Sequence, residues 1–210
     1  MHLSDYTYDL PEELIAQLPA EVRDRSRMMV LHRNTGEIEV RTFRDLPEYF
    51  GEGDLFVVND SRVFPARLVG RKETGGLIEI LLLRRSPGGA PEETWEVLLR
   101  PAKRVRIGMP IVFEEGCRAR VIRRLSEKQW IIEFRMEVPF DDFLSRFGRA
   151  PLPPYIRRSR TWPRSEQDLA RYQTVYARVN GSVAAPTAGL HFTEEMFGRL
   201  RSRSVRIAPV

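Results

Sequence analysis

"LIEILLL" (77–83) opens a series of short apolar runs that are rich in residues favoured in β-strands. The later runs are "WEVLLRP" (95–101), "PIVFEEG" (110–116), "RARVIRRL" (118–125) and "WIIEFRM" (130–136), and "VFPARLVGR" (63–71) precedes them. Gly, Pro and charged residues separate the runs, and no helical pattern lies between them. Consecutive strands of this kind are typical of an antiparallel barrel or sandwich. We therefore predict a β-barrel over residues 60–136.

Helical patterns follow this segment. In "VPFDDFLSRFG" (138–148) the apolar residues share one face and Gly148 ends the pattern. Ser165 and Thr193 are typical capping residues, and they predict the starts of helices in "SEQDLARYQTVYA" (165–177) and "EEMFGRLRSR" (194–203). The last residues, "VRIAPV" (205–210), read as the start of a strand.

The residues before the barrel predict one helix and one hairpin. "YDLPEELIAQLP" (8–19) has a capping residue at Asp9, and its apolar residues fall on one helical face. "MMVLHRNTGEIEVRTF" (28–43) contains two alternating runs joined by a turn that includes Gly36. The fold class expected is an α/β (α+β) body formed by both chain ends, residues 1–59 and 137–210, with an inserted antiparallel β-barrel.

Composition narrows the class of protein. Hydrophobic residues make up 42% and charged residues 30% of the 210, as in globular rather than disordered chains. No apolar run is long enough to span a membrane, and no signal-peptide core follows Met1. The single Cys117 excludes an internal disulfide and a cysteine-based zinc site. We expect a cytoplasmic, monomeric protein without a bound metal.

Charge favours an acidic partner. The net charge is +5 and the isoelectric point is near 9.7, which suits a protein that binds nucleic acid. The basic residues are nearly all Arg, so a compositional bias of the genome explains part of the excess. Charge alone therefore favours RNA or DNA binding only modestly.

Two clusters with polar side chains allow both a structural and a functional interpretation. Asn59, Asp60 and Ser61 end a strand, where they form either an Asx-turn or a site that grips a ribose or phosphate together with Arg62 and Arg67. "LLRPAKRVRIG" (98–108) is either a solvated face or a patch that contacts phosphates.

Two aromatic stretches could face a base. "PLPPYIRR" (151–158) is stiffened by proline, and it either presents Tyr155 for stacking or packs that ring into the core. In "LARYQTVYA" (169–177) Tyr172 belongs to an apolar stripe, which usually means core contact, and Gln173 stands beside it as a hydrogen-bonding group.

The segment "VNGSVAAPTAGLHFT" (179–193) is almost free of charge although charged segments lie on both sides. Gly181 and Gly189 predict places where a ligand approaches the backbone closely. His191 stands just before the start of the last predicted helix, where main-chain amides favour anions. A lone His is more often structural, but this setting makes His191 a candidate acid or base.

Five strings carry a resemblance to a known family. They are "YDLPEELIAQLPAEVRDRSRMMV" (8–30), "GDLFVVNDSRVFPARLVGRKETGGLIEILLL" (53–83), "WEVLLRPAKRVRIG" (95–108), "PLPPYI" (151–156) and "YQTVYARVNGSVAAPTAGLHFT" (172–193). In this order they resemble the S-adenosylmethionine:tRNA ribosyltransferase-isomerases (QueA family), whose fold is an α/β body with an inserted β-barrel.

The resemblance implies an unusual reaction. The ribosyl moiety of S-adenosylmethionine would be transferred to 7-aminomethyl-7-deazaguanine at the wobble position of tRNA and isomerised, which gives epoxyqueuosine and releases adenine and methionine. S-adenosylmethionine is then a substrate, and neither a cofactor nor a metal is required. The alternative is a truncated, non-catalytic paralogue that binds tRNA or other RNA. The family pattern continues beyond Val210, so the resemblance implies weak or no activity for these 210 residues alone.

The resemblance also suggests roles for individual residues. His191 would act as acid/base or orienting group. The expected substrate-binding residues are Asn59, Asp60, Arg62, Arg67, Tyr155, Tyr172, Gln173, Ser182 and Thr187. The expected tRNA-binding residues are Arg100, Lys103, Arg104, Arg106, Arg157 and Arg158.

Overall fold

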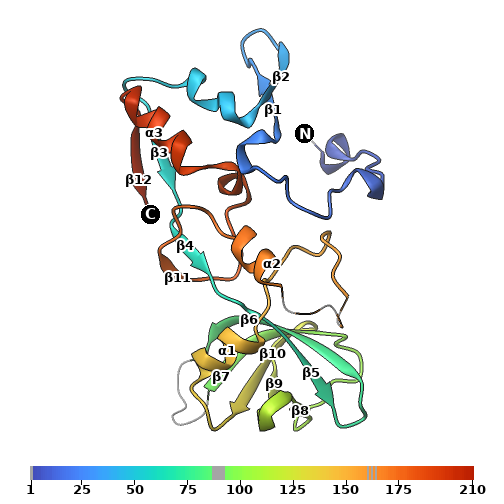
Figure 1. Ribbon diagram of the computed structural model, residues 1–210. Coiled ribbons are helices and arrows are strands. Elements are labelled where there is room, and N and C mark those ends of the chain that lie inside the picture. Colours follow the sequence, from blue (N-terminus) through green and yellow to red (C-terminus); the bar gives the residue numbers. More distant parts are fainter. Residues whose placement is uncertain (1, 87–92, 160, 162, 164) are drawn as a thin grey trace.

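Figure 1 shows two parts of the chain, a β-barrel and, above it, a body that contains both termini. The computed structural model describes residues 2–86, 93–159, 161, 163 and 165–210. The predicted α/β body with an inserted antiparallel barrel is confirmed. No helix among the described residues is long and apolar enough to cross a membrane.

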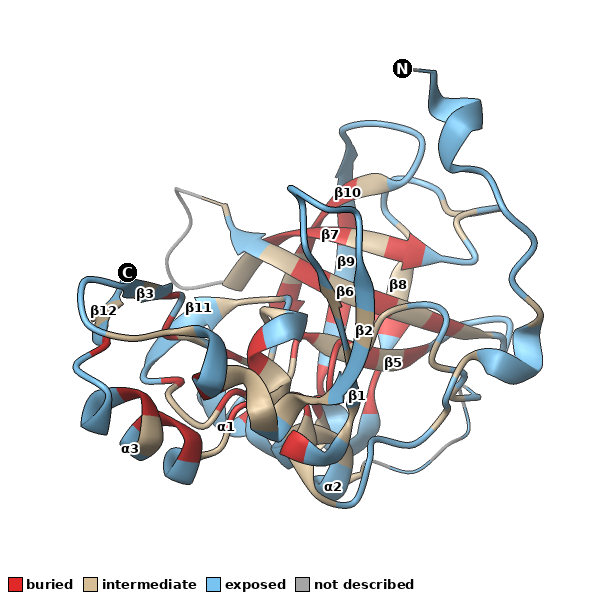
Figure 2. Cartoon of the chain, turned by 90° about the horizontal axis from the view of Figure 1, so that it is seen from above, coloured by how far each residue is buried: buried red, intermediate tan, exposed pale blue. Residues whose placement is uncertain are grey.

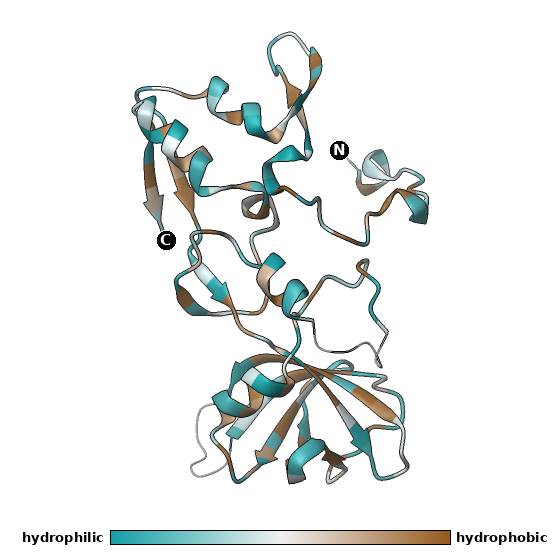
Figure 3. Cartoon of the chain, viewed as in Figure 1, coloured by the Kyte–Doolittle hydropathy of each residue, from teal (hydrophilic) through white to brown (hydrophobic). Residues whose placement is uncertain are grey.

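The barrel is closed by six antiparallel strands in the order β10-β7-β6-β5-β8-β9. The strands are β5 (Arg67–Lys72), β6 (Leu77–Arg85), β7 (Glu93–Arg100), β8 (Pro110–Val112), β9 (Arg118–Arg124) and β10 (Gln129–Arg135). Side chains alternate along each strand, so in β6 Ile78, Ile80 and Leu82 fill the interior while their neighbours face outward. Figure 2 shows this buried interior, and Figure 3 shows the apolar strands that supply it.

Helix α1 (Phe140–Phe147) plugs one end of the barrel. The ring of Phe143 is fully buried and lies 5.4 Å from Phe113 and 6.3 Å from Phe134, measured between ring centroids. As predicted, the helix ends at Gly148. Since an added Cβ at Gly148 would overlap the carbonyl of Pro65, this glycine lets the chain leaving the barrel cross the chain entering it.

The packing of β4 (Ser61–Val63) and α1 differs from the predicted boundaries of the barrel, residues 60 and 136. Strand β4 lies within the predicted barrel range, but it pairs in parallel with β11 (Val179–Ser182) of the body. Conversely, α1 lies in the range assigned to the body but packs against the barrel core. The barrel with its plug therefore extends from about Phe64 to Gly148.

The body is built from two short parallel strand pairs, an antiparallel hairpin and helices. Strand β3 (Leu55–Val58) pairs with β12 (Arg206–Pro209), so the strand predicted at the last residues is confirmed and lies beside a strand that precedes the barrel. The predicted hairpin is also confirmed, as β1 (Arg27–Leu31) and β2 (Ile38–Thr42).

Both predicted capping residues begin helices. The hydroxyl of Ser165 accepts a hydrogen bond from the Asp168 amide at the start of α2 (Glu166–Arg171). Thr193 does the same for the Met196 amide at the start of α3 (Glu194–Ser202). Helix α2 ends earlier than predicted, at Arg171.

The helix predicted near the N-terminus is wrong. Only a single 3₁₀ turn forms there, at Glu12–Leu14, and Leu14 and Leu18 are each 70% exposed. An amphipathic pattern stabilises a helix only where a partner surface covers its apolar face. No such surface lies against this segment among the described residues, and its backbone instead makes contacts with a distant loop, described below.

We predict that Phe143→Ala lowers the free energy of unfolding by about 3–5 kcal/mol, because it opens a cavity among four aromatic rings. Chemical denaturation monitored by tryptophan fluorescence would measure the change. Ile107→Ala, at a side chain that is 67% exposed, is the control and should change stability by less than about 0.5 kcal/mol. Equal effects of the two substitutions would contradict the proposed plug.

Candidate functional site

A cavity of about 340 Å³ lies in the body between the N-terminal segment and three stretches from the second half of the chain. Its wall is formed by residues within 16–26, 152–158, 168–172 and 187–191. Most of the wall is apolar, with a few polar groups converging on it, which is the usual composition of a small-molecule site.

The cavity brings together several residues that the sequence predicted from separate motifs. Tyr155, Tyr172, Thr187 and His191 all line it, and so does Arg158, which was predicted to contact tRNA. Tyr155 is 52% exposed, so of its two alternatives the structure favours a ring that is available to a ligand. Tyr172 is 7% exposed, and burial raises the pKa of its phenol.

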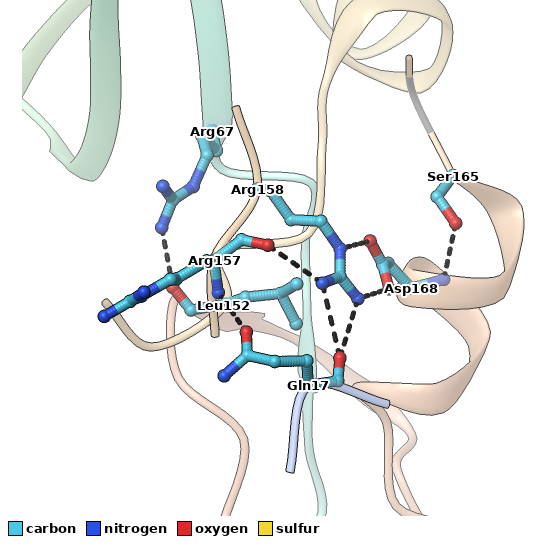
Figure 4. Close-up of polar contacts among 7 residues, drawn as sticks. All are labelled: Gln17, Arg67, Leu152, Arg157, Arg158, Ser165 and Asp168. Carbon is cyan, nitrogen blue, oxygen red and sulfur yellow. Dashed lines mark hydrogen bonds and ion pairs between the residues drawn. The ribbon is translucent and has the colours of Figure 1, made fainter. Parts of the chain in front are cut away.

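Sequence reasoning missed the N-terminal side of the cavity, which Arg158 holds in place (Figure 4). The guanidinium of Arg158 donates two hydrogen bonds of 3.0 Å to the carboxylate of Asp168 and two of 3.3 Å to the carbonyl of Gln17. The Gln17 side chain in turn accepts from the Arg157 amide at 2.7 Å and donates to the Tyr155 carbonyl at 3.1 Å. Arg158 and Asp168 are each 17% exposed, so this ion pair is largely shielded from water.

Two further arginines tie the same segment to the rest of the body. Arg23 donates to the carbonyls of Leu190 at 3.0 Å and Ala170 at 3.1 Å. In the opposite direction, Arg171 donates to the carbonyls of Glu21 and Ala20. Burial, and then the charge of Arg171, lower the pKa of Arg23. Residues 16–26 therefore form a strap, held along its length by guanidinium groups bonded to main-chain oxygens.

His191 lies at the inner side of this strap. Its Nδ1 is 3.4 Å from the carbonyl oxygen of Arg23, and its ring lies 5.1 Å from the ring of Phe43. A carbonyl only accepts hydrogen bonds, so in a neutral imidazole Nδ1 carries the proton and Nε2 keeps its lone pair. The contact therefore favours the tautomer in which Nε2 can accept a proton.

The backbone at Gly189 is not open to a ligand, in contrast to the prediction. A Cβ at this position would overlap the hydroxyl of Tyr176 and crowd Thr174, so the space beside the backbone is filled by the protein itself rather than by a ligand. Gly181 differs, since nothing lies within 4 Å of the corresponding position.

The predicted residues near β4 and β11 lie apart from the cavity, and several are occupied by contacts within the protein. Asn59 accepts from the Ser61 amide at 2.8 Å, which is the Asx-turn alternative. Asp60 accepts from Arg178 at 2.7 Å. Ser182 bonds the backbone of Ala184.

Gln173, Arg62 and Arg67 also form hydrogen bonds within the protein. The Gln173 amide bonds both main-chain groups of Val63. Arg67 donates to Glu79 at 2.9 Å and to the Leu152 carbonyl at 2.6 Å. Arg62 donates to the Ala177 carbonyl at 3.2 Å, and with Gln173 it lines a second, larger cavity of about 1020 Å³ between body and barrel.

The predicted tRNA contacts divide into two groups. Arg100, Lys103, Arg104 and Arg106 are exposed at the end of β7 and in the loop before β8, outside either cavity. Arg157 is exposed and forms an ion pair with Glu12, whereas the Arg158 fork is occupied inside the protein as described.

Comparison with known proteins places this chain in a family that is named for queuosine biosynthesis. Residues 3–210 match the family described as queuosine biosynthesis protein. A protein of Syntrophus aciditrophicus named S-adenosylmethionine:tRNA ribosyltransferase-isomerase is 50% identical, over 100% of this chain and 62% of its own length. A protein of the same name from Symbiobacterium thermophilum is 51% identical, over 99% of this chain and 58% of its own length.

One solved structure is also similar. The S-adenosylmethionine tRNA ribosyltransferase of Thermotoga maritima is 35% identical, and the match covers 98% of this chain and 56% of that chain with a TM-score of 0.37. The chain belongs to the queuosine biosynthesis protein family, and it spans about three fifths of the length of the curated relatives it matches.

We predict that Gly189→Ala lowers the free energy of unfolding by about 1–3 kcal/mol, because the new methyl group must displace Tyr176. Gly198→Ala is the matched control. Gly198 lies within α3 with open space around it, so alanine there should stabilise the protein by about 0.5–1 kcal/mol. Thermal melts of the two variants would show opposite shifts, and a neutral Gly189→Ala would refute the close contact.

We also predict that Asp168→Asn loosens the strap, because it removes the charged partner of Arg158 while keeping the backbone amide that caps α2. Trypsin should then cut at Arg23 or Arg25 several-fold faster than in the wild type. Asp141→Asn is the control, since that carboxylate is 85% exposed in its ion pair with Arg85. Equal cleavage rates for the two variants would show that the ion pair does not hold the strap.

Proposed function

We propose that this chain carries the S-adenosylmethionine site of a tRNA ribosyltransferase-isomerase. In this reaction the ribosyl moiety of S-adenosylmethionine is transferred to 7-aminomethyl-7-deazaguanine in tRNA and isomerised to give epoxyqueuosine. The name of the curated relatives supports the ribosyl transfer and isomerisation, the family resemblance implies the deazaguanine acceptor and the product, and the cavity beneath the strap is the site that we propose. S-adenosylmethionine is a substrate in this proposal, and no cofactor is needed.

One observation carries the proposal. The cavity gathers Tyr155, Tyr172, Thr187 and His191, which come from strings that resemble the family. Its volume of about 340 Å³ lies within the range of small-molecule sites, roughly 300–1,000 Å³. An exposed tyrosine at its edge offers a stacking surface for an adenine ring.

His191 suits the proton transfers that the reaction needs. The attacking amine of the deazaguanine must be neutral, and a proton must leave the ribose carbon beside the sulfonium. A general base within hydrogen-bonding reach would serve either step. The contact of His191 Nδ1 with the Arg23 carbonyl leaves Nε2 as the accepting atom, so the strap would orient the base as well as close the cavity.

The barrel carries the basic residues that would contact the RNA substrate. The exposed basic run from Arg100 to Arg106 supports tRNA as the macromolecular substrate, with phosphate contacts that give affinity rather than sequence specificity. We propose that the protein acts as a monomer in the cytoplasm.

We predict that Tyr155→Ala raises the Kd for S-adenosylmethionine about tenfold, because removal of one stacking ring costs about 1–3 kcal/mol. Isothermal titration calorimetry on the full chain would measure it. Tyr8→Ala, at another exposed tyrosine, is the control and should bind as the wild type does. Binding that is abolished in Arg62→Ala but kept in Tyr155→Ala would move the site to the second cavity. A wild-type chain that binds tRNA but not S-adenosylmethionine would favour the non-catalytic RNA-binding alternative.

A further inference from the structure

Strand pairing gathers three loops at the end of the barrel opposite α1. The loops are β5–β6 (71–76), β7–β8 (100–109) and β9–β10 (123–129), and we call them together the loop end. Arg100 pairs with Glu79 near the start of β6, and Trp130 at the start of β10 pairs with Arg124. The amide of Gly108 bonds the carbonyl of Val121 in β9. These pairings place the three loops side by side.

The two ends of the barrel differ in charge. The loop end contains nine basic and two acidic residues. The end plugged by α1 has an excess of acidic residues, with five acidic and two basic residues in 113–118 and 136–147. Two arginines also bind carboxylates at the α1 end, Arg146 to Glu115 and Arg85 to Asp141.

The basic side chains of the loop end are mostly without partners. Seven of the nine form no side-chain hydrogen bond or ion pair with any described residue: Lys72, Arg100, Lys103, Arg104, Arg106, Arg123 and Lys128. Like charges held close together on a rigid barrel repel one another, which destabilises the fold unless counterions or an anionic partner screen them. If the basic residues of the loop end were only a solvated surface, we would expect acidic residues among them in similar number.

We infer that the loop end of the barrel is the docking face for the phosphate backbone of the RNA substrate. The inference rests on the proposed function for the identity of the partner and extends it to a surface formed by three loops. Lysine and arginine side chains on neighbouring loops match the repeated phosphates of a folded RNA, and each phosphate that they neutralise releases a counterion. The acidic end plugged by α1 repels the same backbone, so the charge polarity of the barrel would orient the RNA.

Two variants test the face, one in each of two loops. The first is Lys103→Gln/Arg104→Gln/Arg106→Gln, and the second is Arg123→Gln/Lys128→Gln. Fluorescence anisotropy with an end-labelled tRNA transcript would give Kd across a series of KCl concentrations. We expect Kd to rise roughly tenfold in the first variant, and the slope of log Kd against log[KCl] to fall by about 0.7–0.9 for each phosphate that either variant no longer neutralises.

The control removes three exposed arginines of the body, Arg27→Gln/Arg33→Gln/Arg201→Gln, and should change neither Kd nor slope by a comparable amount. Melting temperatures would confirm that every variant is folded. Unchanged binding in both loop variants would overturn the inference, as would an equally weakened control. Weaker binding confined to the first variant would contradict a shared face. A failure to bind S-adenosylmethionine, with tRNA binding weakened as expected in both loop variants, would refute the proposed function and leave the docking face standing.

Discussion

The guanidinium group of Arg158 ties the start of α2 to the N-terminal strap, which lies 141 residues earlier in the chain. It joins Asp168 at the start of α2 to the carbonyl of Gln17 in the strap, and the strap closes the cavity over His191. An arginine suits this position because its planar fork satisfies a carboxylate and a carbonyl at the same time. Arg23 and Arg171 hold the rest of the strap in the same way, because the exposed Leu14 and Leu18 add little packing there.

The strap also changes how the arginine content of the chain is interpreted. Arg23, Arg158 and Arg171 bind main-chain oxygens and line the small cavity, so they act as internal cross-links. Most arginines and lysines of the loop end make no such contacts with the described residues and remain available to a partner. The same residue type therefore stabilises the body at one place and forms a charged surface at another.

Features that depend on neighbouring residues could be predicted from the sequence. The caps at Ser165 and Thr193, the hairpin around Gly36 and the alternating strands of the barrel are all decided within a few residues. The helix predicted from Asp9 was wrong because its pattern needed a covering surface that the sequence alone does not reveal. The strap joins residues that lie far apart in the chain, so no local signal could have placed Gln17 beside Arg158.

In the candidate site, too, local motifs could be predicted from the sequence, whereas contacts between distant residues could not. The motif around His191 identified one wall of the cavity, and the proline-rich stretch around Tyr155 identified another. The roles predicted for Asn59, Asp60 and Gln173 remain untested, although each side chain already has a partner within the protein.

We expect S-adenosylmethionine to bind in the cavity beneath the strap. Hydrogen–deuterium exchange of the full chain, with and without saturating S-adenosylmethionine, tests this expectation most directly. We expect slower exchange in 16–26, 153–158 and 187–191, because the ligand would hold these walls together. Protection confined to 61–64 and 179–182, beside the second cavity, would contradict it.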